Sequence, residues 1–226
     1  MALLTFESPN SIAKIKNKLI VADTSYLITL SDANDGRNFL FDDFHFKTLN
    51  AGANFIINVI VRQEFIKKTR EIQMIEAIWD LYTTNPLLQS RYHTVLNFKY
   101  KPLTLANLGS SNADKIYKDH VKQNDSPMLL AALKKNIWDD VKQFEKRANL
   151  TYFGGGGQQS WDDMGKLMQT TGLSATDAMI ANFALAIGAD GIITGDCDFA
   201  PLSDILDIYI PNSIASMCKI YDPAKD

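Results

Sequence analysis

Five acidic residues stand where a chain of alternating strands and helices would bring them to one edge of a sheet. They are Asp23, Glu64, Asp177, Asp196 and Asp198. Asp177 lies three residues after Ser174, a typical helix N-cap, and Asp196 closely follows the short apolar run Ile192-Ile193, which has the character of a buried strand. Ligands of open α/β sheets bind outside the carboxyl ends of the strands. Carboxylates that converge there suggest a site for a divalent metal ion.

The same order of strand, acid and helix occurs earlier in the chain. Lys18–Ala22 is a short apolar run that predicts a buried parallel strand. It leads directly into Asp23, and Thr24 and Ser25 are suited to start a helix. We therefore expect Asp23 at the carboxyl end of a strand.

A second such unit follows. A strand is predicted over Asn54–Ile57 and a helix over Val59–Arg70, with Glu64 in its second turn. One interpretation makes Glu64 a solvated surface residue that pairs with the neighbouring lysines of its helix. The other turns its carboxylate back over the strand ends toward Asp23.

The remaining acids also have an ordinary structural interpretation. Aspartate is common at helix starts and in turns. On that basis Asp177 only caps a helix, and Asp196 and Asp198 only shape a turn. The repeated placement of acids at strand ends and helix starts favours the metal-site interpretation.

The rest of the chain predicts a fold of alternating helices and strands. Residues 1–17 are expected to form an N-terminal extension, and Leu206–Ile210 alternates as a last strand. Further helices are predicted over residues 71–83, 86–98, 111–122, 126–149 and 212–220. This alternation predicts an α/β fold with a central parallel sheet covered by helices on both faces.

Composition limits the function. The chain has 226 residues, of which 46% are hydrophobic and 22% are charged, and these values are typical of a globular protein. A net charge of −3 argues against a protein that coats nucleic acid by bulk electrostatics, but not against a nucleic-acid enzyme. No apolar run approaches the roughly 20 residues that span a membrane, so we expect no membrane association.

The cysteines and the N-terminus indicate a compartment. Only Cys197 and Cys218 are present, and two cysteines do not make a disulfide framework. The first residues lack the basic start and apolar block of a secretory leader. We therefore expect a reducing, cytoplasmic setting.

Four segments combine a strand end or a helix start with one of the acids. They are Val21-Ala-Asp-Thr-Ser-Tyr-Leu27, Val59-Ile-Val-Arg-Gln-Glu-Phe65, Ser174-Ala-Thr-Asp-Ala-Met-Ile180 and Ile193-Thr-Gly-Asp-Cys-Asp-Phe199. In this order they resemble the motifs of PIN-domain ribonucleases, a family that includes the toxins of VapBC-type toxin–antitoxin pairs. The resemblance implies one PIN-like three-layer α/β/α domain over residues 1–226. Its core would cover about 18–70 and 170–211, with a helical insertion at about 71–169.

The resemblance also implies roles for individual residues. Asp23, Glu64, Asp177 and Asp196 match the acidic quartet of the family, and Asp198 falls on a position that is often acidic. Two hydroxyl residues, Thr24 and Thr194, match positions that orient a carboxylate or the phosphate. Hard carboxylate ligands suit Mg²⁺ or Mn²⁺, which activate water and stabilise charge on phosphoryl oxygens. The expected activity is metal-dependent hydrolysis of RNA phosphodiester bonds.

The predicted insertion departs from the family. About 100 residues separate Glu64 from Asp177, many more than in the compact toxins, and this puts the toxin role and an antitoxin partner in doubt more than the nuclease site. The insertion would clamp RNA, bind a partner or form a homo-oligomer interface. Basic and aromatic residues that suit single-stranded RNA are Arg91, Tyr92, Lys99, Tyr100 and Lys101. The plainer interpretation is an aromatic core stripe with solvated basic neighbours.

Two other functions fit less well. A non-catalytic PIN-like module that binds RNA or protein is expected to have lost an acid, and none is missing here. A phosphatase on a doubly wound fold would carry Asp-x-Asp at the first strand end, where this chain has Asp23-Thr-Ser25. The histidines at 45, 93 and 120 occupy scattered segments, so we interpret all three as structural or surface residues.

Overall fold

A computed structural model describes most of the chain, which divides into two compact units. The described residues are 1–87, 89–90, 115, 119, 127–154 and 161–218. The sheet unit comprises Met1–Phe65 and Phe144–Asp226, and the helical unit comprises Ile66–Gln143. The helical unit lies mostly inside the predicted insertion, whereas the last part of that range, residues 144–169, belongs to the sheet unit.

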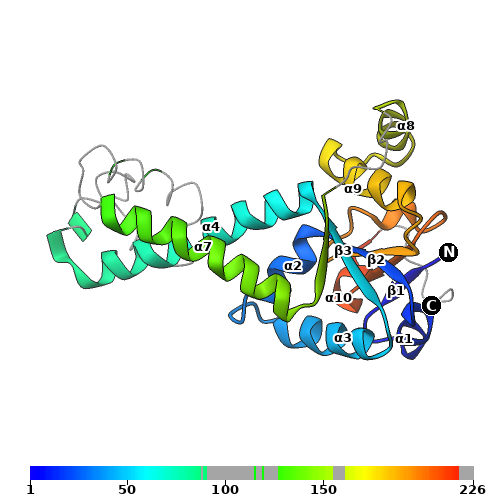
Figure 1. Ribbon diagram of the computed structural model, residues 1–226, viewed down its shortest axis with the longest axis horizontal. Helices are drawn as coiled ribbons and strands as arrows, with labels where there is room; N and C mark the ends of the chain where they lie inside the picture. The colour runs from blue at the N-terminus through cyan, green and yellow to red at the C-terminus, as the bar shows by residue number, and fades with distance from the viewer. Residues whose placement is uncertain (88, 91–114, 116–118, 120–126, 155–160, 219–226) are drawn as a thin grey trace. The chain divides into compact units, whose positions relative to one another are not determined.

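The sheet unit is built on six strands that are all parallel (Figure 1). The strands are β1 (Leu3–Thr5), β2 (Leu19–Ala22), β3 (Asn54–Asn58), β4 (Leu150–Phe153), β5 (Gly191–Ile193) and β6 (Asp207–Ile210). Their order across the sheet is β1-β6-β5-β2-β3-β4. The predicted α/β class with a central parallel sheet is confirmed.

Helices connect the strands and flank the sheet (Figure 1). They are α1 (Pro9–Ile15), α2 (Thr24–Ser31), α3 (Asn38–Asn50), α4 (Val59–Thr84), α7 (Pro127–Arg147), α8 (Trp161–Thr171), α9 (Ala175–Ala186), the 3-10 turn η1 (Ala200–Leu202) and α10 (Asn212–Ala215). Parallel crossovers are right-handed, and the chain moves from β2 to β3 in one direction but from β4 back to β5 in the other. The connecting helices α2 and α3 therefore cover one face and α9 covers the other, which is consistent with a three-layer α/β/α arrangement.

The order of the strands creates a switch point between β2 and β5. After β2 the chain crosses over through α2 and α3, on one face of the sheet, and continues to β3. It reaches β5, the neighbour of β2 on the other side, through α9 on the opposite face. Ala22 at the end of β2 is paired in register with Ile193 at the end of β5. The residues that follow these two strands, Asp23 and Thr194, therefore leave the sheet at the same level. Such a switch point is where ligands bind in doubly wound sheets.

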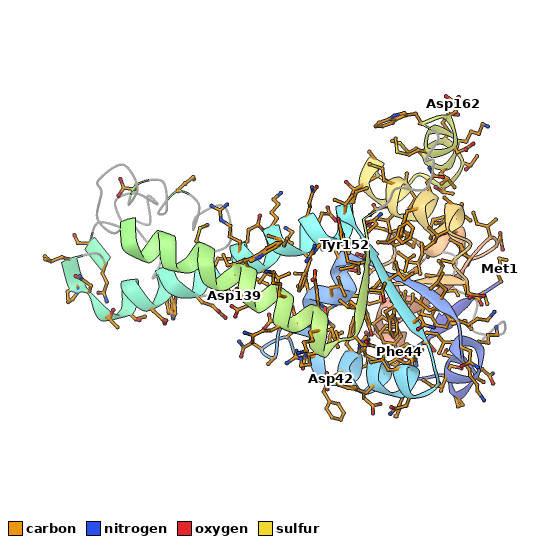
Figure 2. The ribbon with its side chains drawn as sticks, in the orientation of Figure 1. Met1, Asp42, Phe44, Asp139, Tyr152 and Asp162 are labelled. Carbon is orange, nitrogen blue, oxygen red and sulfur yellow. A yellow bond between two sulfur atoms is a disulfide. The ribbon has the colours of Figure 1, made fainter. Side chains whose placement is uncertain are left out.

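The core of the sheet unit lies on both faces of the sheet. The strand residues Ile20, Val21, Ile192 and Ile208 are fully buried, as expected for parallel strands covered by helices. An aromatic cluster lies on the α3 side of the sheet, where Phe44 stacks on Phe6 with ring centroids 4.3 Å apart (Figure 2).

One histidine belongs to this core. The ring of His45 is 1% exposed, its Nε2 lies 2.9 Å from the carbonyl oxygen of Ala148, and its Nδ1 lies 2.9 Å from the hydroxyl of Tyr26. A carbonyl oxygen can only accept, so Nε2 carries the hydrogen and Nδ1 accepts from Tyr26. The interpretation of His45 as a structural residue is confirmed.

Among the described residues, the helical unit contains the later part of α4 and the earlier part of α7. Met74, Ile137 and Val141 are buried in it. Gln73 donates a hydrogen bond of 2.7 Å to the carboxylate of Asp140 across the two helices. The predicted RNA-binding residues Arg91, Tyr92, Lys99, Tyr100 and Lys101 lie outside the described residues.

Short strands at the two edges of the sheet were not predicted. Residues 1–17 contain β1, which pairs with β6 in a register that sets Leu3 opposite Ile208, and α1, which Ser8 caps. The expectation of an N-terminal extension was therefore wrong. β4 also escaped prediction. Three or four residues carry too little periodicity to be assigned, and their partners are distant in the sequence.

Helix boundaries differ as well. α4 is one helix over 26 residues, where two helices were predicted, because no proline or glycine interrupts its pattern. α3 was not predicted at all. The predicted helix 126–149 corresponds to α7, which ends before Asn149, a residue with φ of +49°. Asparagine tolerates this left-handed conformation better than most residues.

The two cysteines form a disulfide, contrary to expectation. Cys197 and Cys218 are bonded with their Cα atoms 5.5 Å apart. The strand β6 and helix α10 carry the chain back beside the turn that holds Cys197, an approach that the spacing of 21 residues does not reveal. Among the described helices, none is long and apolar enough to cross a membrane.

Candidate metal and phosphate site

Asp23 occupies the carboxyl end of β2 and is almost fully buried. Its side chain is the N-cap of α2, and the residue is 4% exposed. Its Oδ2 atom accepts hydrogen bonds from the Ser25 amide at 3.2 Å, the Ser25 hydroxyl at 2.6 Å and the Thr194 hydroxyl at 3.0 Å. No described side chain donates to Oδ1. The backbone amide of Thr24 also donates to this carboxylate. The protein therefore fixes the orientation of Asp23 through several hydrogen bonds.

Burial makes the charged form of Asp23 costly. Removal from water raises its pKa from 3.8 to about 6, against the lowering effect of the hydrogen bond from Ser25, and the nearby charge of Asp196 raises it further. No described lysine or arginine forms an ion pair with Asp23. A buried carboxylate in this state is stabilised by a bound cation.

The carboxyl end of β5 supplies the second part of the site. Thr194 is fully buried, and its hydroxyl also lies 3.3 Å from Oδ1 of Asp196. That same oxygen accepts the amide of Asp198 at 3.1 Å, which closes the turn. A β-carbon at Gly195 would lie 3.2 Å from the carbonyl oxygen of Ser25, so a larger residue here would push the turn away from α2 by a few tenths of an ångström.

Ser25 is a functional candidate that sequence reasoning missed. Its hydroxyl donates to Asp23 and accepts the amide of Gly195 at 2.9 Å, so it joins the ends of β2 and β5. From the sequence, Ser25 is expected only at the start of a helix. Its position two residues after Asp23 could have indicated this contact, because an N-cap carboxylate accepts a hydrogen bond from the amide two residues on.

Glu64 approaches the site through a second hydroxyl. The hydroxyl of Thr24 donates to Oε2 of Glu64 at 2.9 Å, and Glu64 is half-buried. Lys68 pairs with Glu71 instead, at 3.1 Å. The two adjacent hydroxyls at the start of α2 therefore donate to different carboxylates. Thr24 donates to Glu64 and Ser25 donates to Asp23.

Asp177 lies at the start of α9 and takes part in its cap. The Ser174 hydroxyl donates to Oδ2 of Asp177 at 2.5 Å and accepts the Asp177 amide at 3.2 Å. The predicted role of Ser174 as N-cap is confirmed. The carboxylate is also close enough to Asp198 to affect it, because burial first, and then the charges of Asp196 and Asp177, raise the pKa of Asp198.

Hydroxyls or charges link four of the acids, Asp23, Asp177, Asp196 and Asp198, whereas Glu64 forms a hydrogen bond only with the Thr24 hydroxyl among the described residues of the site. No three histidine, cysteine, aspartate or glutamate side chains of the described residues are close enough to hold a metal ion together. The chemistry of the donor set nevertheless fits a hard divalent cation, because it offers only carboxylate and hydroxyl oxygens.

An ordered aromatic residue lies at the same edge of the sheet. Tyr152 is level with Ile57 in the register and is labelled in Figure 2. The guanidinium of Arg62 lies 4.5 Å from the centre of its ring and makes two hydrogen bonds of 2.7 and 2.8 Å to Glu145. The guanidinium of Arg62 therefore binds Glu145 and packs on Tyr152.

The arrangement can do specific chemistry. Carboxylates at the switch point of a parallel sheet, with hydroxyls that orient them, suit a divalent cation and the phosphate oxygens that such a cation binds. In comparisons with known proteins, no family model matches the chain and no curated protein matches it.

Proposed function

We propose that the protein is a metal-dependent ribonuclease of the PIN-like type. The observation that carries the proposal is Asp23, which is 4% exposed at the end of β2, shares the Thr194 hydroxyl with Asp196 and has no described cationic partner. Buried carboxylates without a cation are costly, and catalytic sites are where such costs are found.

Mg²⁺ or Mn²⁺ would be held by Asp23 and Asp196, with Glu64, Asp177 and Asp198 around them. A bound ion of this kind supplies an activated water and stabilises the negative charge that develops on the phosphoryl oxygens. The roles of these five acids remain predictions from the sequence, and their placement at one edge of the sheet supports them.

The chain's own residues would orient the ligands. Ser25 and Thr194 hold one oxygen of Asp23 and so fix the direction of the other. Thr24 does the same for Glu64. Ligands whose second oxygen is held in this way lose less freedom when they bind a metal, so the site needs less reorganisation.

The proposal includes a substrate and a setting. The proposed substrate is RNA. The proposed partners are an antitoxin protein or a second copy of the chain. The proposed compartment is the cytoplasm. The placement of the acids supports the nuclease part, and the partners follow only from the resemblance to PIN-domain toxins.

A non-catalytic module that binds RNA or protein is the second candidate. One observation favours it, namely that no three potential ligands among the described residues already lie within reach of a common metal ion. Under this alternative, Asp177 and Asp196 serve as helix cap and turn residue.

One experiment separates the two. A labelled pool of single-stranded RNA is incubated with wild type and with Asp23→Asn, in Mn²⁺, in Mg²⁺ and in EDTA. The ribonuclease proposal predicts cleavage by wild type that requires a metal and is lost in the variant. Absence of cleavage together with absence of Mn²⁺ binding in calorimetry would favour the binding module.

A further inference from the structure

A disulfide lies inside the acidic turn at the end of β5. Cys197 is the residue between Asp196 and Asp198, and it is bonded to Cys218 beyond α10. These are the only two cysteines in the chain. The bond therefore joins the turn that carries two candidate ligands to the C-terminal segment of the sheet unit.

The other restraints on the middle of the turn are hydrogen bonds. Asp196 contacts the Thr194 hydroxyl through its amide and its carboxylate, both at 3.3 Å, and the Asp198 amide reaches Asp196 at 3.1 Å. The amide of Ala200 donates to the carbonyl oxygen of Cys197 at 3.0 Å. The two ends of the turn are also held, because the Gly195 amide donates to the Ser25 hydroxyl at 2.9 Å and Phe199 is fully buried. Between these ends, the disulfide is the covalent tie that joins Cys197 to a distant part of the chain.

The other end of the bond is anchored. Cys218 is 7% exposed and Ala215 in α10 is fully buried. The amide at the start of α10, that of Asn212, donates to the carboxylate of Glu7 at 2.9 Å. The C-terminal segment can therefore hold Cys197 in place for as long as the bond exists.

Repulsion acts on the turn in the opposite direction. Asp196 and Asp198 lie two residues apart in a turn that the Asp198 amide closes onto Oδ1 of Asp196 at 3.1 Å, and like charges at this spacing repel one another. A turn without its covalent tie can relieve this repulsion by moving the carboxylates apart. Binding of a metal ion then has to bring the carboxylates together again, which weakens the observed affinity.

We propose that the Cys197–Cys218 disulfide is a redox switch for the candidate metal site. With the disulfide formed, the turn is held in place and the site binds a divalent cation tightly. With the two cysteines reduced, the turn is released and the cation is bound weakly. This inference rests on the proposed function, because it concerns the affinity of the same site.

The switching step is a thiol–disulfide exchange with a cellular or added dithiol. One thiolate of the dithiol attacks the sulfur of Cys197, which is half-buried and hence the more accessible of the pair, and the Cys218 sulfur leaves and takes up a proton. The second thiol of the reagent then displaces Cys197. The protein disulfide is reduced by two electrons, and the dithiol is oxidised to its own disulfide.

The test compares one protein in two redox states. Wild type is prepared oxidised, and a second sample is reduced with dithiothreitol and desalted under nitrogen. Mn²⁺ affinity is measured by calorimetry, and amide hydrogen exchange is measured over residues 195–199 by mass spectrometry. We expect the reduced protein to bind Mn²⁺ at least about tenfold more weakly, or about 1.4 kcal/mol, and its turn to exchange faster.

A variant supplies the matched control. Cys218→Ser removes the bond at its distant end and leaves the residues beside the acids unchanged. Its Mn²⁺ affinity should equal that of reduced wild type and should not respond to dithiothreitol, while circular dichroism shows whether it is folded.

Each outcome decides a different point. Equal Mn²⁺ affinity in oxidised and reduced wild type would overturn the switch and leave the proposed metal site intact. Absence of Mn²⁺ binding in both states would overturn the proposed metal site and, with it, the redox regulation of that site. Unchanged hydrogen exchange of the turn on reduction would overturn the tether itself, whether or not the metal binds.

Discussion

The buried hydroxyl of Thr194 lies 3.0 Å from Oδ2 of Asp23, a residue 171 positions away in the sequence, and 3.3 Å from Oδ1 of Asp196. A hydroxyl has only one hydrogen, so it cannot fully satisfy both carboxylates at once. The Ser25 hydroxyl, at 2.6 Å, supplies the short hydrogen bond to Asp23. The ends of β2 and β5 are thus joined through polar side chains that share a limited number of hydrogens, and a cation between the carboxylates would relieve this shortage.

Removal of the Thr194 hydroxyl should weaken metal binding. Thr194→Val keeps the shape of the side chain but leaves Asp23 and Asp196 without their shared donor, and the loss of a hydrogen bond to a charged group is worth about 1.5–3 kcal/mol. Mn²⁺ affinity measured by calorimetry should therefore fall by at least about tenfold. Thr194→Ser, which restores the hydroxyl, should recover most of it. Wild-type Mn²⁺ affinity in Thr194→Val would show that the hydroxyl does not support the site.

Asp23→Asn should stabilise the metal-free protein at neutral pH. The pKa of Asp23 is raised in the folded state from 3.8 to about 6, so the folded protein binds more protons between these values and the free energy of unfolding falls as pH rises through this window. The full penalty, at most about 3 kcal/mol, is present above pH 6 and absent below about pH 4. Urea unfolding in EDTA at pH 7.5 and pH 4.5 measures the difference between variant and wild type.

Mn²⁺ provides the control for that prediction. The ion should stabilise wild type at pH 7.5 and have little effect on Asp23→Asn, because the variant lacks the charged ligand. A variant that is less stable than wild type in EDTA at pH 7.5 would contradict the assigned cost of burying Asp23.

His45 should make the protein sensitive to acid. Burial lowers the pKa of His45 below 6.5, because the charged ring is disfavoured in the core. The folded state holds the ring neutral, so stability is unaffected above the unfolded pKa of 6.5 and is lost as pH falls through that value. His45→Gln keeps a side-chain donor for the Ala148 carbonyl and cannot titrate. Its free energy of unfolding should be lower than that of wild type at pH 7.5 and should depend less on pH between 7 and 5.

Sequence reasoning located the units in which local patterns agree with the fold. The apolar run before Asp23, the strand before Asn58 and the capped helix that starts after Ser174 all lie where they were predicted. The amide of Val61 donates to the Asn58 side chain at 2.9 Å, as expected for an N-cap. In these places, propensity, periodicity and capping chemistry give the same answer.

The features that escaped prediction depend on partners distant in the sequence. β1 has three residues and is defined by its pairing with β6 at the other end of the chain. The Cys197–Cys218 disulfide depends on the return of the chain through β6, and the link from Ser25 to Gly195 spans 170 positions. Local patterns carry no information about such contacts, which become visible only when the strand order is known.

The most direct test of the ribonuclease proposal compares two aspartates at opposite edges of the sheet. Asp196 follows β5 at its carboxyl end, whereas Asp204 is exposed and precedes the amino end of β6. Cleavage of a labelled single-stranded RNA pool in Mn²⁺ is measured for wild type, Asp196→Asn and Asp204→Asn, with circular dichroism as the check of folding. We predict that Asp196→Asn loses cleavage by at least about a hundredfold, because removing even a residue that only supports a metal ligand costs about 10–100-fold, and that Asp204→Asn cleaves like wild type. Cleavage by folded Asp196→Asn at the wild-type rate would contradict the account.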